Sequence, residues 1–155
     1  MLRIGLISDT HGLLRPEALA FLRGSDCIVH GGDIGNEGIL DTLRAIAPLT
    51  VVRGNNDTAD WARDIPESAH MQLDAGTVYV LHNLAQLGID PVREGVRVVV
   101  SGHSHRPLVR EEDGVLYINP GSAGPRRFKL PITVGELMVA DGAISSRIVE
   151  LSAGR

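Results

Sequence analysis

Residues 2–12 read LRIGLISDTHG, a short apolar run that ends in Asp9, His11 and Gly12. A run of this kind is typical of a buried strand, which we expect at 2–8. The same order returns twice further along the chain. An apolar run at 27–30 precedes Gly31-Gly32-Asp33, and another at 49–52 precedes Gly54-Asn55-Asn56-Asp57.

Helical patterns separate these three apolar runs. Residues 16–23 begin with Pro16, which suits the first turn of a helix, and residues 37–47 stop before Pro48. An order in which strands and helices alternate predicts an α/β fold that begins with a mainly parallel sheet.

The second half of the chain is richer in strands. Three pairs of apolar runs flank glycine-containing turns, which is typical of β-hairpins, at 71–73 with 78–81, 108–111 with 115–118, and 133–140 with 143–151. The β-branched run at 97–100 predicts a further strand, and 84–87 a short helical turn. No repeat or linker divides the sequence, so we expect one domain, 1–155, of two packed sheets with outer helices.

The composition excludes several classes of protein. With 43% apolar and 22% charged residues and no apolar run of about 18 residues, the chain is not expected to cross or bind a membrane. The formal net charge of −4 argues against broad nucleic-acid binding. Cys27 is the only cysteine and no signal-peptide pattern is seen, so we expect a cytoplasmic protein.

Side chains that bind metals follow the apolar runs, and in open α/β sheets the ends of strands form the ligand crevice. These side chains are Asp9, His11, Asp33, Asn55, His82, His103 and His105. Two carboxylates, an amide and four imidazoles suit Mn, Fe, Co, Ni or Zn. Because seven ligands exceed the needs of one ion, we expect two divalent ions that share a carboxylate. Such a centre keeps a positive charge and suits a phosphoryl group. His30 is a candidate to hydrogen-bond behind the ligands.

In these residues the chain resembles the calcineurin-like metallophosphoesterase superfamily, and within it the small YfcE-like phosphodiesterase branch. The resemblance covers residues 2 to about 126. It rests on Asp9-Thr10-His11-Gly12, Gly32-Asp33, Gly54-Asn55, Gly102-His103-Ser104-His105 and a late motif, Asn119-Pro120-Gly121-Ser122 with Pro125-Arg126.

The resemblance implies a four-layer α/β/β/α sandwich of two mixed sheets, and a dinuclear phosphodiesterase that acts on a small phosphodiester. One ion would bind Asp9, His11, Asp33 and His105, and the other Asp33, Asn55, His82 and His103. A hydroxide bridging the two ions would attack phosphorus, and manganese is the metal most often found to support such enzymes.

The sequence departs from this family at two places beside the site. Larger members carry a histidine at the position of Asn56, where it is thought to protonate the leaving group. Here the proton would come from water or from Asp57, or would not be supplied; Asp57 has an equally good interpretation as a loop anchor. His82 is followed by Asn83-Leu84, where many relatives have Gly-His, and Asn83 is a candidate substitute.

Other functions stay open at this point. A phosphomonoesterase would use the same ligands, and so would a nuclease acting on short oligonucleotides. A non-catalytic Vps29-like protein-interaction scaffold would be expected to have degraded ligand positions, whereas all seven are competent here. The exposed edges of the late hairpins leave a homodimer as an alternative to a monomer.

Overall fold

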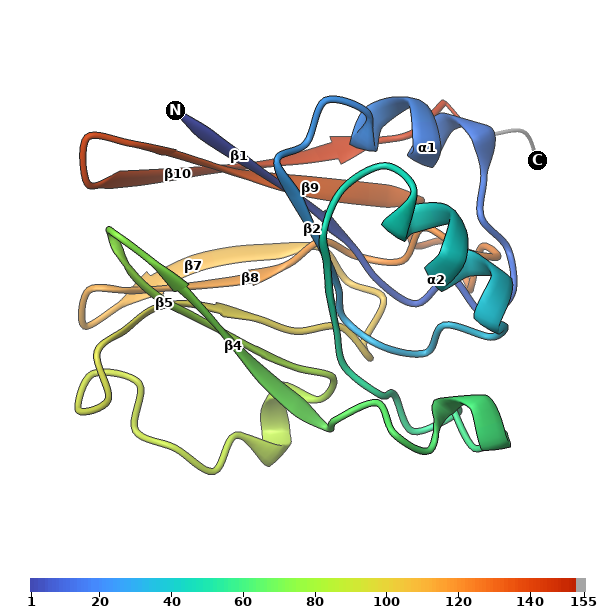
Figure 1. The fold of residues 1–155 in the computed structure, drawn as a ribbon, viewed down its shortest axis with the longest axis horizontal. Helices are drawn as coiled ribbons and strands as arrows, with labels where there is room; N and C mark the ends of the chain where they lie inside the picture. Colours follow the sequence, from blue (N-terminus) through green and yellow to red (C-terminus); the bar gives the residue numbers. More distant parts are fainter. Residues whose placement is uncertain (153–155) are drawn as a thin grey trace.

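The computed structural model describes residues 1–152, which form two five-stranded sheets packed face to face (Figure 1). The first sheet has the strand order β10-β9-β1-β2-β3. Its parallel part is β1 (Leu2–Ile7), β2 (Cys27–His30) and β3 (Leu49–Val51). On the other side of β1, the antiparallel hairpin of β9 (Thr133–Ala140) and β10 (Ala143–Glu150) completes the sheet.

The second sheet has the order β4-β5-β6-β8-β7 and is also mixed. Its centre is parallel and consists of β5 (Gly76–Leu81), β6 (Val96–Val100) and β8 (Val115–Asn119). The two edge strands, β4 (Ser68–Leu73) and β7 (Leu108–Glu112), pair antiparallel with their neighbours. The three predicted hairpins are therefore confirmed.

The alternation of side chains along β1 shows how the first sheet joins two layers. Ile4 and Leu6 belong to the apolar core between the sheets, whereas Ile7 packs in a second core beneath the helices. Those helices, α1 (Pro16–Leu22) and α2 (Glu37–Arg44), cover the outer face of the first sheet (Figure 1). Gly5 allows α1 to approach closely, because a Cβ atom there would lie 2.6 Å from Leu22 Cδ2.

The predicted four-layer α/β/β/α sandwich is confirmed, although its fourth layer is thin. The outer face of the second sheet is covered by the short 3₁₀ helix η2 (Leu84–Gln86) and irregular chain, with Leu84 and Leu87 packed against Tyr79 and Leu81. Several details differ from the sequence prediction, among them the start of β4, which lies at Ser68 rather than at residue 71. Helix α2 ends at Arg44 rather than at residue 47, since residues ahead of Pro48 turn out of the helix. A 3₁₀ turn, η1 (Asp60–Ala62), also forms in the loop after β3.

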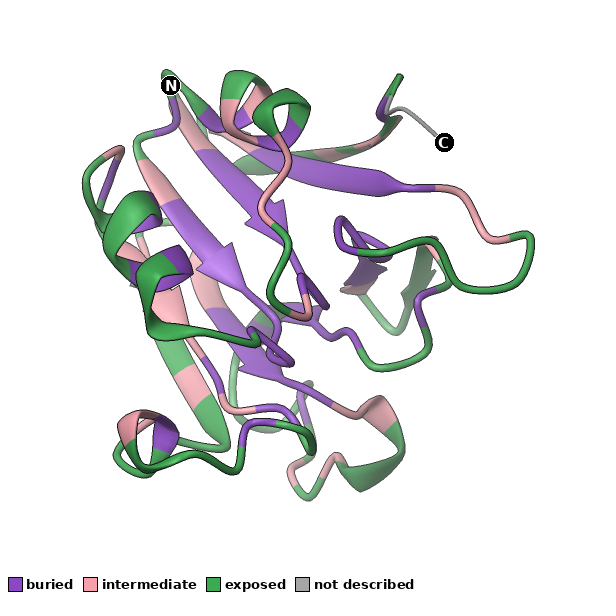
Figure 2. Ribbon diagram, turned by 90° about the vertical axis from the view of Figure 1, so that its right-hand side faces the viewer, coloured by how far each residue is buried: buried purple, intermediate pink, exposed green. Residues whose placement is uncertain are grey.

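The loops that carry the predicted ligands meet at one end of the molecule. They follow β1, β2, β3, β5 and β6, whose carboxyl ends point the same way. Figure 2 shows this end, where several of the loops are buried although they are irregular chain. Among residues 1–152, none of the helices has the length and apolar character that crossing a membrane requires.

Candidate metal centre

The ligand-bearing loops are tied together through their backbones. Asp9 N–H donates to the Gly32 carbonyl at 3.0 Å, and His11 N–H donates to the Asp33 carbonyl at 2.9 Å. Between the loops of the second sheet, Gly102 N–H donates to the His82 carbonyl at 2.9 Å. Because buried backbone groups need partners, these contacts fix the loops against one another.

Most candidate ligands adopt a backbone conformation that side chains rarely take. Eight non-glycine residues within 1–152 have positive φ, and five of them are candidate ligands: Asp9, His11, Asp33, His103 and His105. Each such residue costs roughly 1–3 kcal/mol unless its surroundings hold it in place. Strain of this kind concentrates at functional sites, and here it turns the five side chains toward one region.

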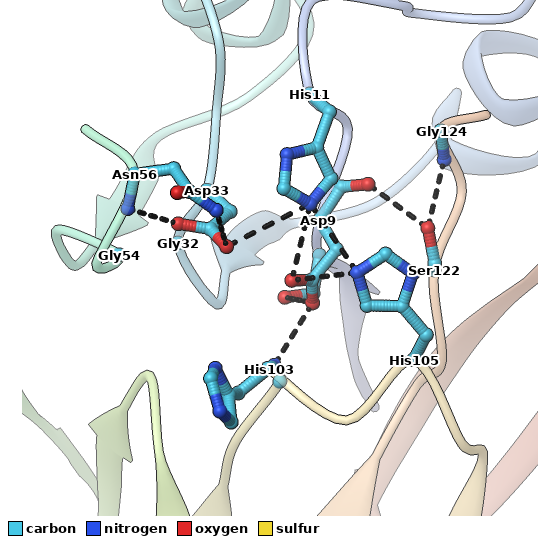
Figure 3. A network of polar contacts seen from close by, with 12 residues as sticks. Asp9, His11, Gly32, Asp33, Gly54, Asn56, His103, His105, Ser122 and Gly124 are labelled. Atoms are coloured by element: carbon cyan, nitrogen blue, oxygen red, sulfur yellow. Dashed lines mark hydrogen bonds and ion pairs between the residues drawn. The ribbon is translucent and has the colours of Figure 1, made fainter. Parts of the chain in front are cut away.

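The first group of ligand atoms surrounds Asp9 (Figure 3). His105 Nε2 lies 3.4 Å and His11 Nε2 3.8 Å from Asp9 Oδ1, and the two imidazole nitrogens are 3.2 Å apart. The other oxygen, Asp9 Oδ2, accepts from Ser8 Oγ at 2.7 Å and from His103 N–H at 3.1 Å. The carboxylate is therefore anchored by one oxygen while the other faces the histidines.

The second group surrounds Asp33. Its Oδ2 atom lies 3.2 Å from His82 Nε2 and 3.6 Å from His11 Nε2. Asn56 donates its backbone N–H to Asp33 Oδ1 at 2.9 Å and its side-chain amide to Oδ2 at 3.1 Å. Burial alone would raise the pKa of Asp33, but the contacts with His82 and the Asn56 N–H outweigh it and hold that pKa well below its usual range.

The histidines on either side of Asp33 are affected in opposite directions. Burial lowers the pKa of His11, and the nearby aspartates offset only part of this effect. For His82, burial acts in the same direction, but the contacts with Asp33 and the Gly31 carbonyl raise its pKa overall. His82 Nδ1 lies 2.7 Å from the Gly31 oxygen, which can only accept, so Nδ1 carries a proton and Nε2 is the nitrogen that faces the aspartates.

His103 and Asn55 lie at the exposed edge of the cluster. His103 Nδ1 is 3.2 Å from Asn55 Oδ1, and the His103 ring packs edge-on against His82 with centroids 5.2 Å apart. The structure thus brings all seven predicted ligand residues together at one end of the sandwich.

These donors fit a divalent metal. Within residues 1–152, Asp9 Oδ1 and His82 Nε2 are buried without a hydrogen-bond partner, although buried polar atoms are normally paired. Both atoms face the aspartate–histidine cluster, where donor atoms of Asp9, Asp33 and His82 lie within 4.8 Å of one another. Carboxylate and imidazole donors at such spacing match the ligands that first-row divalent ions take.

His30 lies behind this cluster, as the sequence suggested. It is fully buried, its Nδ1 accepts from Gly32 N–H at 3.0 Å, and its Nε2 lies 3.0 Å from Thr10 Oγ1. Thr10 Oγ1 in turn donates to the Ile34 carbonyl at 2.7 Å. Burial lowers the pKa of His30 to about 4, so the ring is neutral and joins the loops after β1 and β2.

Asp57 and Asn83 make contacts that favour structural roles. Asp57 is buried, and both of its oxygens accept backbone N–H groups, from Ile34 at 2.9 and 3.2 Å, Gly35 at 3.3 Å and Gly54 at 2.9 Å. Asn83 Oδ1 accepts from Ala85 N–H at 3.0 Å and begins η2. Of the two interpretations of Asp57, these contacts support the loop anchor.

The late motif braces the centre, a role that the sequence did not reveal. The Asn119 amide donates to the Gly102 carbonyl at 2.9 Å and to Ser104 Oγ at 3.2 Å, while its oxygen accepts from Gly121 N–H. Ser122 Oγ donates to the Asp9 carbonyl at 2.9 Å (Figure 3). The motif therefore holds both the loop of His103 and His105 and the loop of Asp9.

The chain is similar to known proteins in its sequence and in its fold. Residues 2–142 match the sequence model of the calcineurin-like phosphoesterase superfamily domain. A probable metallophosphoesterase of Methanothermobacter thermautotrophicus is 36% identical in an alignment 132 positions long, which covers 77% of this chain and 76% of that protein. The phosphodiesterase YfcE of Escherichia coli K12 is 26% identical in an alignment 167 positions long, gaps included, which covers 88% of each chain. The fold is similar to the crystal structure of Vps29 from Chaetomium thermophilum, with a TM-score of 0.78 at 19% identity and 97% of each chain covered.

The buried, neutral His30 predicts a loss of stability in acid. Its folded pKa, about 4, lies below the unfolded value of 6.5, so the unfolded chain binds the proton more readily between these values. The metal-free protein should lose about 3 kcal/mol of unfolding free energy from this residue as pH falls from 6.5 to 4. Urea unfolding at several pH values measures the loss, and His30→Gln should flatten the slope. An unchanged slope in His30→Gln would contradict the assignment.

Because the Asn119 side chain hydrogen-bonds the loop of His103 and His105, we expect the metal affinity to depend on this amide. Asn119→Asp keeps the acceptor for Gly121 N–H but loses the donor to Gly102 and Ser104, so the loop of His103 and His105 is held less firmly. We expect Mn²⁺ affinity to fall roughly 10–100-fold, as for other residues that orient metal ligands. Isothermal titration calorimetry measures the change. Gln72→Glu, an amide change on the distant β4 strand, is the matched control and should leave the affinity as in the wild type.

Proposed function

Because the chain belongs to the calcineurin-like phosphoesterase superfamily, we propose that it is a metal-dependent phosphodiesterase with two divalent ions in its centre. The observation that carries the proposal is the set of buried donor atoms, above all Asp9 Oδ1 and His82 Nε2, which face the centre without a hydrogen-bond partner within residues 1–152. Manganese is the metal we propose, and iron, zinc, nickel or cobalt would suit the same donors.

The distances support Asp33 as the shared ligand. A single oxygen, Asp33 Oδ2, faces one histidine from each group, His82 at 3.2 Å and His11 at 3.6 Å. We assign one ion to Asp9, His11, Asp33 and His105, and the other to Asp33, Asn55, His82 and His103. The contacts with His82 and Asn56 hold the pKa of Asp33 down and keep it ionised, which a shared ligand requires.

The protein's contribution to the reaction is orientation and charge. When bound, the ions would supply an activated water and positive charge for the phosphoryl oxygens. The chain holds the donors in place through the Ser8, Asn56 and Gly31 contacts, so the ligands need little rearrangement. Two carboxylates cannot neutralise two divalent ions, and the positive remainder attracts an anionic diester.

Neither of the two candidate residues, Asn56 and Asp57, is suited to protonate the leaving alcohol. An amide cannot protonate an alkoxide, and Asn56 already donates to Asp33. Asp57, the other candidate, uses both oxygens to accept backbone N–H groups. We therefore propose that Asp33, Asn55 and His82 act through the metals, and that departure of the alcohol depends on its own stability as an anion.

A non-catalytic scaffold is the main alternative, because Vps29 has a similar fold. The ligand set distinguishes the two functions, since a scaffold has no need of seven converging donors. Metal analysis after Mn²⁺ loading tests the point. Two ions per chain support the enzyme, whereas less than one ion together with no hydrolysis would favour the scaffold.

Replacing the shared ligand should abolish turnover. We expect Asp33→Asn to lower Mn²⁺-dependent hydrolysis of bis(p-nitrophenyl) phosphate by at least about a hundredfold, because both ions lose a charged ligand. Release of p-nitrophenol measures the rate. Asp64→Asn, an exposed aspartate in the loop after β3, removes the same charge outside the centre and should retain wild-type activity. Equal rates for the wild type and Asp33→Asn would exclude the proposed function.

The missing acid predicts a strong dependence on the leaving group. Bis(p-nitrophenyl) phosphate should be hydrolysed at least about a hundredfold faster than diphenyl phosphate, because phenolate is the poorer leaving group. Asp57→Asn should cost roughly 1–3 kcal/mol of stability through the lost amide contacts, and should leave the ratio of the two rates unchanged. A selective loss of diphenyl phosphate hydrolysis in Asp57→Asn would instead identify Asp57 as the acid.

A further inference from the structure

A hollow of about 480 Å³ lies against the candidate metal centre and shares His103 with it. Its walls come from the loop after β6, the residues that lead into β7, and the start of η2. Leu130, in the loop that follows the late motif, also lines the hollow. A substrate group attached to a phosphate at the centre could enter this hollow directly, since one residue borders both.

The lining of this hollow is largely apolar. Leu84, Pro107, Leu108 and Leu130 contribute side chains to it. Leu108 is 43% exposed, so an apolar surface there meets water unless a ligand covers it. Leu84 places a hydrocarbon side chain in this lining, next to Asn83. Ligand sites commonly combine such an apolar lining with a few polar groups.

A second hollow of about 480 Å³ adjoins the centre at Asn55 and His82, and its character is different. Its lining includes the charged residues Arg53 and Glu67. Asn83 borders both hollows. The centre is therefore adjoined by an apolar hollow at His103 and by more polar hollows at Asn55, and a phosphodiester has two ester groups to place.

Charge further limits what the apolar hollow accepts. Among the lining residues within 1–152, Arg106 is the one with a charged side chain, and that side chain is exposed. A guanidinium at this position favours the phosphate anion and repels a cationic ester group. Since none of these lining residues has a carboxylate, a positively charged substituent would find no partner among them.

We propose that the hollow beside His103 binds an uncharged hydrocarbon ester group of the substrate, such as an aryl group. The proposal rests on the proposed function, because the phosphate of the same molecule must occupy the metal centre. It assigns Leu84, Leu108 and Leu130 to substrate selection, through the apolar surface that they would bury against the ester group.

The test compares phenyl phosphate with methyl phosphate on the Mn²⁺-loaded protein by isothermal titration calorimetry. The two ligands share the phosphate and differ only in the ester group, so the ratio of their Kd values reports on the hollow. We expect phenyl phosphate to bind about tenfold more tightly. In Leu108→Gln the ratio should fall to about threefold or less, because a neutral polar side chain replaces the apolar wall.

Val109→Gln is the matched control. Val109 follows Leu108 in β7, has a similar exposure of 44%, and lines a different hollow with Arg97 and Ile144. Neighbouring strand residues point to opposite faces, so this variant makes the same kind of change outside the proposed site. It should keep the tenfold ratio.

The outcomes separate this proposal from the one on which it rests. Equal affinities in the wild type, or a ratio that Leu108→Gln leaves at tenfold, would overturn the assignment of the hollow alone. Binding of neither ligand would overturn the assignment of the hollow, whereas hydrolysis of bis(p-nitrophenyl) phosphate decides the proposed function separately. A preserved preference for phenyl phosphate, lost in Leu108→Gln, with no hydrolysis of any diester would overturn the activity and support the ligand class of the hollow.

Discussion

The rest of the structure depends on bringing two buried carboxylates, Asp9 and Asp33, to one point. Their facing oxygens lie within 4.8 Å of each other and of His82 Nε2, and two buried negative charges this close are costly unless they are compensated. Both carboxylates accept hydrogen bonds from neighbouring loops. Asn56, for example, donates its backbone N–H and its side-chain amide to Asp33. The close approach leaves no room for side chains on the adjoining chain: a Cβ atom at Gly54 would overlap the Asp33 carboxylate.

The two sheets contribute different parts of this arrangement. The loops of the first sheet carry the carboxylates, whereas those of the second carry His82, His103 and His105. The apolar core between the sheets therefore sets the distance between the carboxylates and these three imidazoles, and the centre is complete only when the sheets are packed. The late motif reinforces this coupling, because Asn119 ends a strand of the second sheet while Ser122 contacts the backbone of Asp9 in the first.

Features that depend on nearby residues could be predicted from the sequence. Apolar runs followed by polar side chains predicted the strands and the seven candidate ligands, since both patterns are local. The pairing of β9 with β1 and the order of β6, β8 and β7 depend on contacts between distant segments, which periodicity does not encode. The contrast between Asn56 and Asp57 was equally hidden. They are adjacent in the chain, yet loop dihedral angles direct one to the Asp33 carboxylate and the other to the amides of the loop after β2.

Asn56 links the proposed chemistry to the proposed substrate. It supplies two N–H donors to Asp33 and no transferable proton. An amide at this position favours an ionised, well-oriented shared ligand and gives no help to the departing alcohol. An enzyme built in this way turns over best when the ester group leaves readily by itself, and aryl groups do so because phenols are stronger acids than alkyl alcohols. An apolar hollow beside His103 that favours such groups would compensate for the missing acid by selecting substrates that do not need one.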